Sequence, residues 1–529
     1  MGLVLTNTLT GKKEVFKPIG DTVKIYICGM TVQGPPHFGH MRAYITSDIL
    51  VRHLEFSGYK LKVIQNFTDI DDKVIEKSLE EKIDYRIIAK NHIDEYFEVA
   101  DKMNIKRADF YPNATQHIQE IIDLIKILEN KNYAYESKGD VYFAVEKFAD
   151  YGKLSKKKLD DLIAGARVEI REQKKNPADF ALWKTSKPNE PWWESPWGRG
   201  RPGWAIECSA MSMHYLGETL DLHLGGEDLI FPHHENEIAQ SEAASGKPFV
   251  RYWIHNSMLN LTGEKMSKST KHFITAKELL EKYSPNVIRL YFLKSHYRSP
   301  QEFDFKILDA NKEAWKRIEE FLYSAEEAGA VENLKLEIRN SKFAEVMDDD
   351  LNTPKVIALV FDAVKDGFSV IQNKNIDELS KYYSEVLFYL QNLGFRTEIE
   401  ARSVKMGLTD ISSTYVQFYE SIKKSVESID YKKIDDIRES MAKALSDIKI
   451  QPTKEINTKT RELFENLVQV ANTIKQFSWG QISQKIVEAR NLSRKNKQFE
   501  ISDLLRKGLE EMGYTLEDTD KGTRIKRKS

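Results

Sequence analysis

Residues 23–40 read VKIYICGMTVQGPPHFGH, an apolar run that leads into a turn rich in glycine and proline. The run Val23–Ile27 predicts a buried strand, and the residues after Gly39 predict a helix from about Met41 to Ser57. A second strand is expected over Leu61–Phe67, before a polar turn and a further helix. Because strands and helices alternate, this stretch predicts an α/β domain with a doubly wound parallel sheet.

The α/β pattern is interrupted once before it resumes. Residues from about 115 to 200 contain a lone predicted strand, 141–145, and the Trp/Pro-rich segment 191–197, which together indicate an insertion. The pattern continues with a helix over 204–215, a strand over 220–224, a tight turn at 225–226, a helix over about 232–244 and a strand over 252–258. After about residue 275 apolar residues recur at helical spacing, so we expect an almost wholly helical remainder.

The composition fits an ordinary soluble protein with several domains. The chain has 529 residues, of which 41% are hydrophobic and 30% are charged, and its net charge is −2, so any site for a polyanion must be local. Two cysteines exclude a disulfide scaffold and suit a reducing compartment. The sequence has no apolar stretch of the length that spans a bilayer. We therefore expect a cytoplasmic location without membrane association.

The turn His37-Phe38-Gly39-His40 lies between the first strand and its helix. A helix N-terminus presents free N–H groups and a partial positive charge to which phosphate can bind, and Gly39 lets the backbone approach a ligand closely. The imidazoles of His37 and His40 can donate hydrogen bonds to the charge that develops when an α-phosphate is attacked. Taken alone, such a turn is more often structural.

A second candidate phosphate-binding element is the segment Lys265-Met266-Ser267-Lys268-Ser269. Its two lysines are compact point charges suited to the β- and γ-phosphates of a leaving pyrophosphate, although a solvated basic loop has the same composition. Together, and in this order along the chain, the histidine turn and the lysine segment resemble the signature of class I aminoacyl-tRNA synthetases.

Four residues of metal-ligand type accompany these elements, namely Cys28, Cys208, His233 and Glu237. Zinc accepts thiolate, imidazole and carboxylate ligands in tetrahedral geometry, and His233 and Glu237 are four residues apart in a predicted helix and would share one face. A lone cysteine is usually a small buried hydrophobic residue, and Glu237 would be an ordinary surface charge in many helices. These alternatives lose force because both cysteines flank the predicted nucleotide site.

A zinc ion at this place would serve to recognise a thiol. An apolar pocket separates side chains that differ by one small group by only about 1–3 kcal/mol, whereas rejection of serine by a factor of about ten thousand needs about 5.5 kcal/mol. A direct bond between sulfur and zinc can supply that difference, because an alcohol competes poorly with a thiolate for the metal. We therefore predict that cysteine is the amino acid and that no editing domain is required.

Longer motifs resemble those of the cysteinyl-tRNA synthetases. They occupy residues 26–40, 67–73, 179–184, 201–211, 231–237 and 265–269. The family's zinc ligands fall on Cys28, Cys208, His233 and Glu237. The resemblance implies ATP-dependent formation of cysteinyl-adenylate from L-cysteine and transfer of cysteine to the 3′ end of tRNA(Cys), with one Zn²⁺ per chain and Mg²⁺ accompanying ATP. We expect the protein to be a monomer.

The resemblance also implies roles for individual residues. The catalytic residues would be His37, His40, Lys265 and Lys268. The ATP site would comprise His37, Gly39, His40, Gly226, Asp228 and Lys268. The amino-acid pocket would be lined by Gly29, Thr31, Thr68, Trp204 and His223.

The implied fold is a class I Rossmann-like catalytic domain with an inserted subdomain, followed by a helical bundle and a small C-terminal anticodon-binding domain. The catalytic halves would span 1–115 and 201–275, on either side of a connective subdomain over 116–200. A stem-contact and helical domain over 276–396, a helical insertion of unknown role over 397–485 and an anticodon-binding segment over 486–529 would follow. Ile525 stands where the family usually has an aromatic residue, so one base-stacking contact is expected to be absent or supplied elsewhere.

Two other functions compete with this interpretation. A ligase that joins cysteine to an amino sugar would use the same catalytic half, but such enzymes resemble a truncated synthetase, and the long stretch beyond residue 397 argues against one. A nucleic-acid-binding module with structural zinc and no catalysis is disfavoured because both the histidine turn and the lysine segment are intact.

Overall fold

The computed structural model describes residues 2–157, 173–261, 274–332, 342–373, 375–397, 514–519 and 522–527. The chain divides into two compact units, Met1–Thr397 and Glu398–Ser529. In the second unit the structure describes one antiparallel hairpin, formed by β13 (Tyr514–Thr519) and β14 (Gly522–Arg527). This hairpin falls within the predicted anticodon-binding segment over 486–529. Apart from Thr397, the predicted insertion over 397–485 lies outside the described residues. Among the described helices, none combines the length and the apolar character that a membrane span requires.

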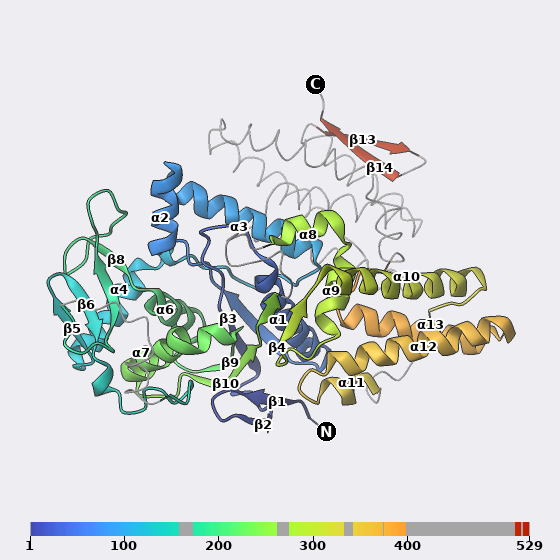
Figure 1. The fold of residues 1–529 in the computed structure, drawn as a ribbon, viewed down its shortest axis with the longest axis horizontal. Coiled ribbons are helices and arrows are strands. Elements are labelled where there is room, and N and C mark those ends of the chain that lie inside the picture. The colour runs from blue at the N-terminus through green and yellow to red at the C-terminus, as the bar shows by residue number, and fades with distance from the viewer. Residues whose placement is uncertain are drawn as a thin grey trace, which may run out of the picture. The chain divides into compact units, whose positions relative to one another are not determined.

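Four parallel strands in the order β10-β9-β3-β4 form the central sheet of the first unit (Figure 1). They are β3 (Thr22–Ile27), β4 (Lys60–Gln65), β9 (Leu220–Gly226) and β10 (Val250–Asn256). The predicted parallel sheet is thus confirmed. The predicted tight turn at Gly225–Gly226 is wrong, because parallel pairing with His255 and Asn256 keeps both glycines in β9.

The order of these strands creates a crevice at their carboxyl ends. β3 continues through α1 (Phe38–Phe56) to β4 on one side, whereas β9 continues through α7 (Glu235–Ser245) to β10 on the other. Where neighbouring parallel strands lead away in opposite directions, the space above their carboxyl ends is open to a ligand. The predicted helix over about 232–244 corresponds to a π-helical turn at Ile230–His234 followed by α7, and Phe231, with the extended angles φ −140° and ψ 131°, marks the break just before the predicted start.

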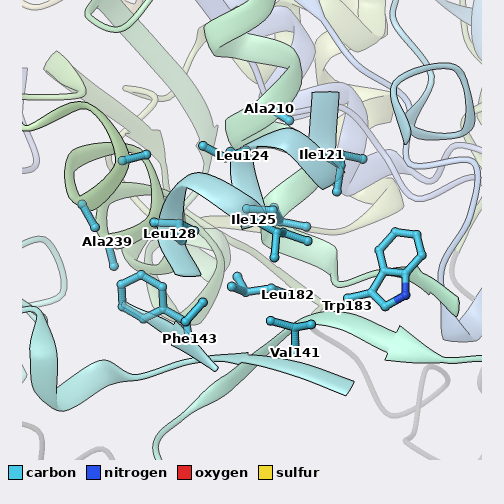
Figure 2. Close-up of a cluster of buried hydrophobic side chains, with 14 of the residues drawn as sticks. Ile121, Leu124, Ile125, Leu128, Val141, Phe143, Leu182, Trp183, Ala210 and Ala239 are labelled. Atoms are coloured by element: carbon cyan, nitrogen blue, oxygen red, sulfur yellow. The ribbon is translucent and has the colours of Figure 1, made fainter. Parts of the chain in front are cut away.

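The segment between the two halves of the parallel sheet forms a sheet of its own. Its antiparallel strands are β5 (Ala134–Ser137), β6 (Asp140–Phe143), β7 (Phe180–Thr185) and β8 (Gly200–Pro202). Figure 2 shows apolar side chains of α4 (Ile118–Asn130) packed over Val141, Phe143 and Leu182 of this sheet. The prediction of one lone strand here is wrong, because β5, β7 and β8 pair alongside β6. β5 and β8 are short and lack an apolar run, whereas β7 was missed although residues 180–183 are apolar.

Most of the remaining elements are helical. They are α2 (Asp72–Glu81), α3 (Tyr85–Lys102), α6 (Trp204–Leu216), α8 (Ala276–Lys282), α9 (Pro285–Leu293), α10 (Phe305–Glu327), α11 (Lys342–Met347), α12 (Thr353–Asn373) and α13 (Ile376–Asn392). An N-terminal hairpin consists of β1 (Val4–Asn7) and β2 (Lys12–Val15). Strands interrupt the predicted helical remainder, since β12 (Gln301–Phe303) pairs in parallel with β11 (Leu259–Leu261), and the β13–β14 hairpin follows near the end of the chain.

A buried ion pair joins the first helix of the α/β domain to the helical segment. Arg289 of α9 is 1% exposed, and its guanidinium contacts the buried carboxylate of Asp48 on α1. The same guanidinium donates from Nη1 to the Met103 carbonyl at 2.9 Å and from Nε to the Leu393 carbonyl at 2.5 Å. The buried guanidinium of α9 therefore joins three other parts of the chain: α1, the end of α3 and the end of α13.

Replacement of Arg289 by methionine should destabilise the first unit. The substitution keeps much of the side-chain volume but removes one partner of a buried pair, a change that typically costs about 3–5 kcal/mol. Chemical unfolding followed by tryptophan fluorescence measures the decrease in the free energy of unfolding. The matched control is Lys106→Met, which removes an exposed contact with Glu55 and should cost less than about 1 kcal/mol. Equal losses for the two variants would contradict the assignment.

Candidate active site

Loops that follow β3 and β4 meet at the crevice and bring together three predicted amino-acid-binding residues. The Gly29 amide donates to Asn66 Oδ1 at 2.8 Å, and Thr31 and Thr68 form a parallel β-bridge. A Cβ on Gly29 would lie 1.5 Å from the Asn66 carbonyl oxygen, so the close approach of the two loops requires glycine. Gly29, Thr31 and Thr68 thus lie beside Cys28 at the end of β3.

A buried cluster of potential metal ligands adjoins these loops, since Cys28 directly precedes Gly29. Ligand atoms of Cys28, His233, His234 and Glu237 all lie within 4.8 Å of one another. Cys28 Sγ is 3.5 Å from His233 Nε2, which is 3.2 Å from Glu237 Oε1. The thiol of Cys208, on α6, interacts with both Cys28 and His233. All four predicted ligands therefore meet, and His234 is a fifth candidate that the sequence did not indicate.

Burial and mutual repulsion control protonation within the cluster. Burial, together with Cys28 and Glu237, raises the pKa of the Cys208 thiol well above its usual value. A hydrogen bond with Cys208 lowers the pKa of Cys28, but burial and the negative charges of Glu237 and Glu207 outweigh it and raise the pKa. Burial lowers the pKa of His233, whereas Cys208 and Glu237 raise it to a value above normal. The cluster therefore favours positive charge at its centre.

Two aromatic residues predicted for the amino-acid pocket adjoin the cluster. The Trp204 ring centroid is 4.2 Å from that of His233, and Trp204 is 41% exposed, so one part of it faces solvent. His223 is fully buried, and its Nε2 lies 3.0 Å from Glu237 Oε2. His223 also stacks on Trp253 with ring centroids 4.5 Å apart. This geometry makes His223 a support for Glu237.

Glu207 is a site residue that the sequence did not single out. It is 1% exposed, and its Oε1 accepts a hydrogen bond from Thr68 Oγ1 at 3.2 Å. Burial and the neighbouring Cys208 raise the pKa of Glu207 well above its usual value. In the sequence, only its place directly before Cys208 could have identified Glu207 as a site residue. Burial of its carboxyl depends on how α6 packs against the loop after β4.

The two histidines of the turn form a reciprocal cap at the start of α1. His37 Nδ1 accepts from the His40 amide at 3.2 Å, and His40 Nδ1 accepts from the His37 amide at 3.3 Å. The two rings are stacked with centroids 3.4 Å apart. A Cβ on Gly39 would lie 3.1 Å from the His37 ring, so Gly39 leaves room for this stack. Capping explains why α1 begins at Phe38, earlier than predicted.

Both histidines of the turn are held neutral. Burial lowers the pKa of His37 to about 4. Burial, together with the adjacent His37, lowers the pKa of His40 well below its usual value. Because each Nδ1 accepts a hydrogen bond from a backbone amide, the proton of each neutral ring resides on Nε2. Each ring is thus a neutral N–H donor, the form expected to bind developing negative charge.

Lys265 and Lys268 lie outside the described residues, but both flanks of their segment are described. The Phe38 amide donates to the Ile274 carbonyl at 3.1 Å, and the Ala276 amide donates to the Pro36 carbonyl at 2.8 Å. On the other flank, Arg42 Nη1 donates to the Met258 carbonyl at 2.7 Å. The described residues before and after the lysine segment are therefore hydrogen-bonded to the histidine turn and its helix.

The predicted adenosine-binding residues lie at the end of β9 and in the turn after it. Gly226 is the last residue of β9, and Asp228 lies in the short turn that comes next. Burial raises the pKa of Asp228, and its charge in turn acts on His233. The neighbouring Glu227 accepts from Ser257 Oγ at 2.8 Å and from the Met258 amide at 3.0 Å, which fixes this turn against the end of β10. Through Asp228 the turn therefore acts on His233 of the cluster, and through Glu227 it is held at the carboxyl end of β10, where the crevice lies.

Comparison with known proteins gives a consistent result. Residues 15–313 match the family model of class I (C) tRNA synthetase catalytic domains, and residues 342–395 match the DALR domain. The cysteine–tRNA ligase of Persephonella marina is 43% identical over 540 aligned positions, which cover 100% of both chains. That of Thermodesulfovibrio yellowstonii is 45% identical and covers 95% of its own length but 82% of this chain. Relatives therefore differ in length.

Among solved structures, the chain is similar in fold to Mycobacterium tuberculosis methionyl-tRNA synthetase in complex with methionyl-adenylate. The TM-score is 0.50 at 14% sequence identity, and the match covers 71% of this chain and 90% of the other. At this level of identity the likeness concerns the fold alone.

Lower pH should weaken the fold through His37. Its pKa is about 4 in the folded chain against 6.5 for a free side chain, so between these values only the unfolded chain binds the proton. Stability therefore falls as pH falls through this window, by about 2 kcal/mol between pH 7 and pH 5. The variant His37→Asn keeps a capping side chain but does not titrate. Urea unfolding of both proteins at the two pH values should show a smaller loss for the variant; parallel losses would contradict this assignment.

Proposed function

We propose that this chain, which belongs to the cysteine–tRNA ligase family of class I tRNA synthetases, selects its amino acid through a zinc ion. The protein is a ligase that attaches cysteine to tRNA(Cys), with ATP, cysteine and tRNA as substrates. The comparisons give no support to an amino-sugar ligase or to a non-catalytic zinc module. The buried group of Cys28, His233 and Glu237, with the thiol of Cys208 interacting with Cys28 and His233, carries the zinc proposal.

The chemistry of the cluster fits a divalent cation. Glu237 Oε1 lies 3.2 Å from His233 Nε2 but makes no aligned hydrogen bond among the described residues, so this buried carboxylate oxygen keeps the capacity to bind a cation. The raised pKa values of Cys28 and Cys208 would be reversed by a metal, since metal coordination deprotonates thiols. His223 holds the other oxygen of Glu237 and orients it, as outer hydrogen bonds do around metal ligands.

We favour Cys208 over His234 as the fourth ligand. His234 Nδ1 lies 2.8 Å from His255 Nε2, and His234 Nε2 is 3.9 Å from Glu237 Oε1, farther than His233 Nε2 is. The thiol of Cys208, by contrast, interacts with Cys28 and His233 together. Two thiolates, one imidazole and one carboxylate are all ligand types that zinc accepts.

When bound, zinc would bond the substrate sulfur directly and thereby distinguish cysteine from serine. The chain's own residues position the rest of the amino acid: Gly29, Thr31 and Thr68 form the rim beside Cys28, and Trp204 covers His233. Glu207 fixes the hydroxyl of Thr68. Cysteine would thus enter with its side chain toward the buried cluster and its carboxylate toward the crevice.

Activation of the carboxylate is assigned to the histidine turn and the lysine segment. His37 and His40 would donate from Nε2 to the α-phosphate of ATP, with Gly39 leaving space and Gly226 and Asp228 facing the adenosine. Lys265 and Lys268 would hold the leaving pyrophosphate, with Mg²⁺ accompanying ATP. The hydrogen bonds that attach both flanks of the lysine segment to the turn support this assignment.

We also propose that the protein acts as a monomer in the cytoplasm. Every residue of the proposed zinc cluster comes from one chain, so the site needs no partner subunit. Thiolate ligation requires reduced cysteines, and both cysteines of the chain are free and buried, which suits a reducing compartment.

Substitution of Cys208 should remove metal and activity together. We expect Cys208→Ser to lose most of its zinc and its cysteine-dependent pyrophosphate exchange, because a hydroxyl is a poor zinc ligand. The matched variant His234→Gln should keep one zinc per chain. Metal content measured by atomic absorption, with circular dichroism as the control for folding, separates the two. Full zinc in Cys208→Ser together with loss of zinc in His234→Gln would show that His234, rather than Cys208, is the fourth ligand.

Amino-acid selection should depend on the thiol. Pyrophosphate exchange with cysteine should exceed exchange with serine by a factor of about ten thousand in kcat/KM, which corresponds to about 5.5 kcal/mol. Such a ratio is beyond the reach of an apolar pocket for side chains of this size. Measurement of both rates on metal-replete enzyme gives the ratio directly. A ratio below about one hundred would mean that packing alone selects the substrate.

A further inference from the structure

An open groove lies between the inserted antiparallel sheet and the α2–α3 helical pair, which are neighbours in Figure 1. Its walls are the end of α2, the start of α3 at Tyr85, the loop from Ser186 to Trp192, and Arg199. The groove has a volume of about 660 Å³, which falls within the range of about 300–1,000 Å³ typical of ligand sites. The Trp/Pro-rich segment singled out in the sequence forms part of this wall, and the proposed function gives it no role.

Trp192 presents an aromatic face in this groove. It is 44% exposed, and the Arg199 guanidinium lies over one side of its ring at 3.9 Å from the centroid. Glu194 holds Arg199 in this position with a 3.0 Å contact to Nε. Among the residues that the structure describes, no aromatic ring packs against Trp192. A large aromatic side chain that is partly open to solvent beside a cation is a surface for stacking.

The charges around the groove favour a polyanion with planar groups. The side chains of Lys187 and Arg199 are 77% and 63% exposed. Each forms a surface ion pair, Lys187 with Glu190 at 4.0 Å and Arg199 with Glu194 at 3.0 Å, and such exposed pairs are weak enough to leave both cations able to contact a phosphate. The acidic groups of the lining are already engaged, since Asp84 contacts Arg86 at 2.6 Å and Glu190 lies 3.6 Å from the buried Arg201. An aromatic face beside exposed cations is the arrangement that binds single-stranded nucleic acid, with bases stacked and phosphates near lysine or arginine.

The groove is connected to the active site through a short segment. Arg201 contacts Asp72 at the start of α2, and α2 follows the loop that carries Thr68. Three residues after Arg201, Trp204 packs on His233 of the cluster. The enzyme must deliver the 3′ end of its tRNA to this cluster, and that end is the part of the substrate with unpaired bases. We propose that Trp192 is a stacking platform for a base of the single-stranded 3′ end of the tRNA.

The test compares the two half-reactions in the full-length enzyme. Trp192→Ala should lower kcat/KM for tRNA charging about tenfold, the effect expected from loss of one base stack, and leave cysteine-dependent pyrophosphate exchange unchanged. Trp192→Phe should restore most of the charging. Phe110→Ala is the matched control, because Phe110 is equally exposed at 44% but lies outside the groove, and it should leave both reactions unchanged.

A binding measurement keeps the proposal testable if charging is affected for other reasons. Removal of the unpaired 3′ nucleotides from tRNA should weaken binding to the wild-type enzyme, and this difference should disappear in Trp192→Ala. Loss of pyrophosphate exchange in parallel with charging would overturn the proposal, since the residue would then act on the amino-acid site. Unchanged charging by Trp192→Ala would also overturn it, and a peptide would then be the better candidate for the groove.

Discussion

The pairing of β3 with β9 is the constraint on which the active site depends. Ile27 lies opposite Leu224, and the Cys28 amide donates to the Leu224 carbonyl at 3.0 Å, so the first cysteine is held against the strand that leads to Gly226 and His233. A slip of one residue would turn every side chain of β3 to the other face of the sheet. Because the two strands then lead to opposite sides, the crevice above them stays open for substrates.

Burial sets the charge of the two halves of the site in opposite ways. At the histidine turn, burial removes positive charge and leaves two neutral N–H donors, which suits contact with a phosphate without trapping it as a fixed ion pair would. At the cluster, burial keeps Cys28 and Cys208 protonated while Glu237 favours a cation, so the cluster is complete only with positive charge at its centre. The same physical effect thus prepares one place for an anion and the other for a metal.

The sequence predicted those parts of the fold that depend on local residue patterns. Val23–Ile27 and the turn after it identify a strand and a helix, and the parallel sheet follows from their alternation. β5 and β8 were missed because each depends on pairing with β6 or β7 rather than on its own residues, and β7 was missed although its first residues are apolar. His234 and Glu207 were missed for a similar reason, since packing of α6 and α7 decides what they contact. The roles assigned to individual site residues stay predictions, and Lys265 and Lys268 lie outside the described structure.

The segment from Trp192 to Trp204 shows how one stretch of chain can serve two substrates. Its first tryptophan borders the groove, and its last covers His233 at the amino-acid site. Between them, Arg201 contacts Asp72, and β8 pairs with β7, which hold the stretch rigid on both sides. A flexible connection of this length would let the two aromatic residues move independently. Because the connection instead includes the strand β8 and the buried guanidinium of Arg201, a base stacked on Trp192 would lie at a nearly constant distance from the cysteine that the cluster holds.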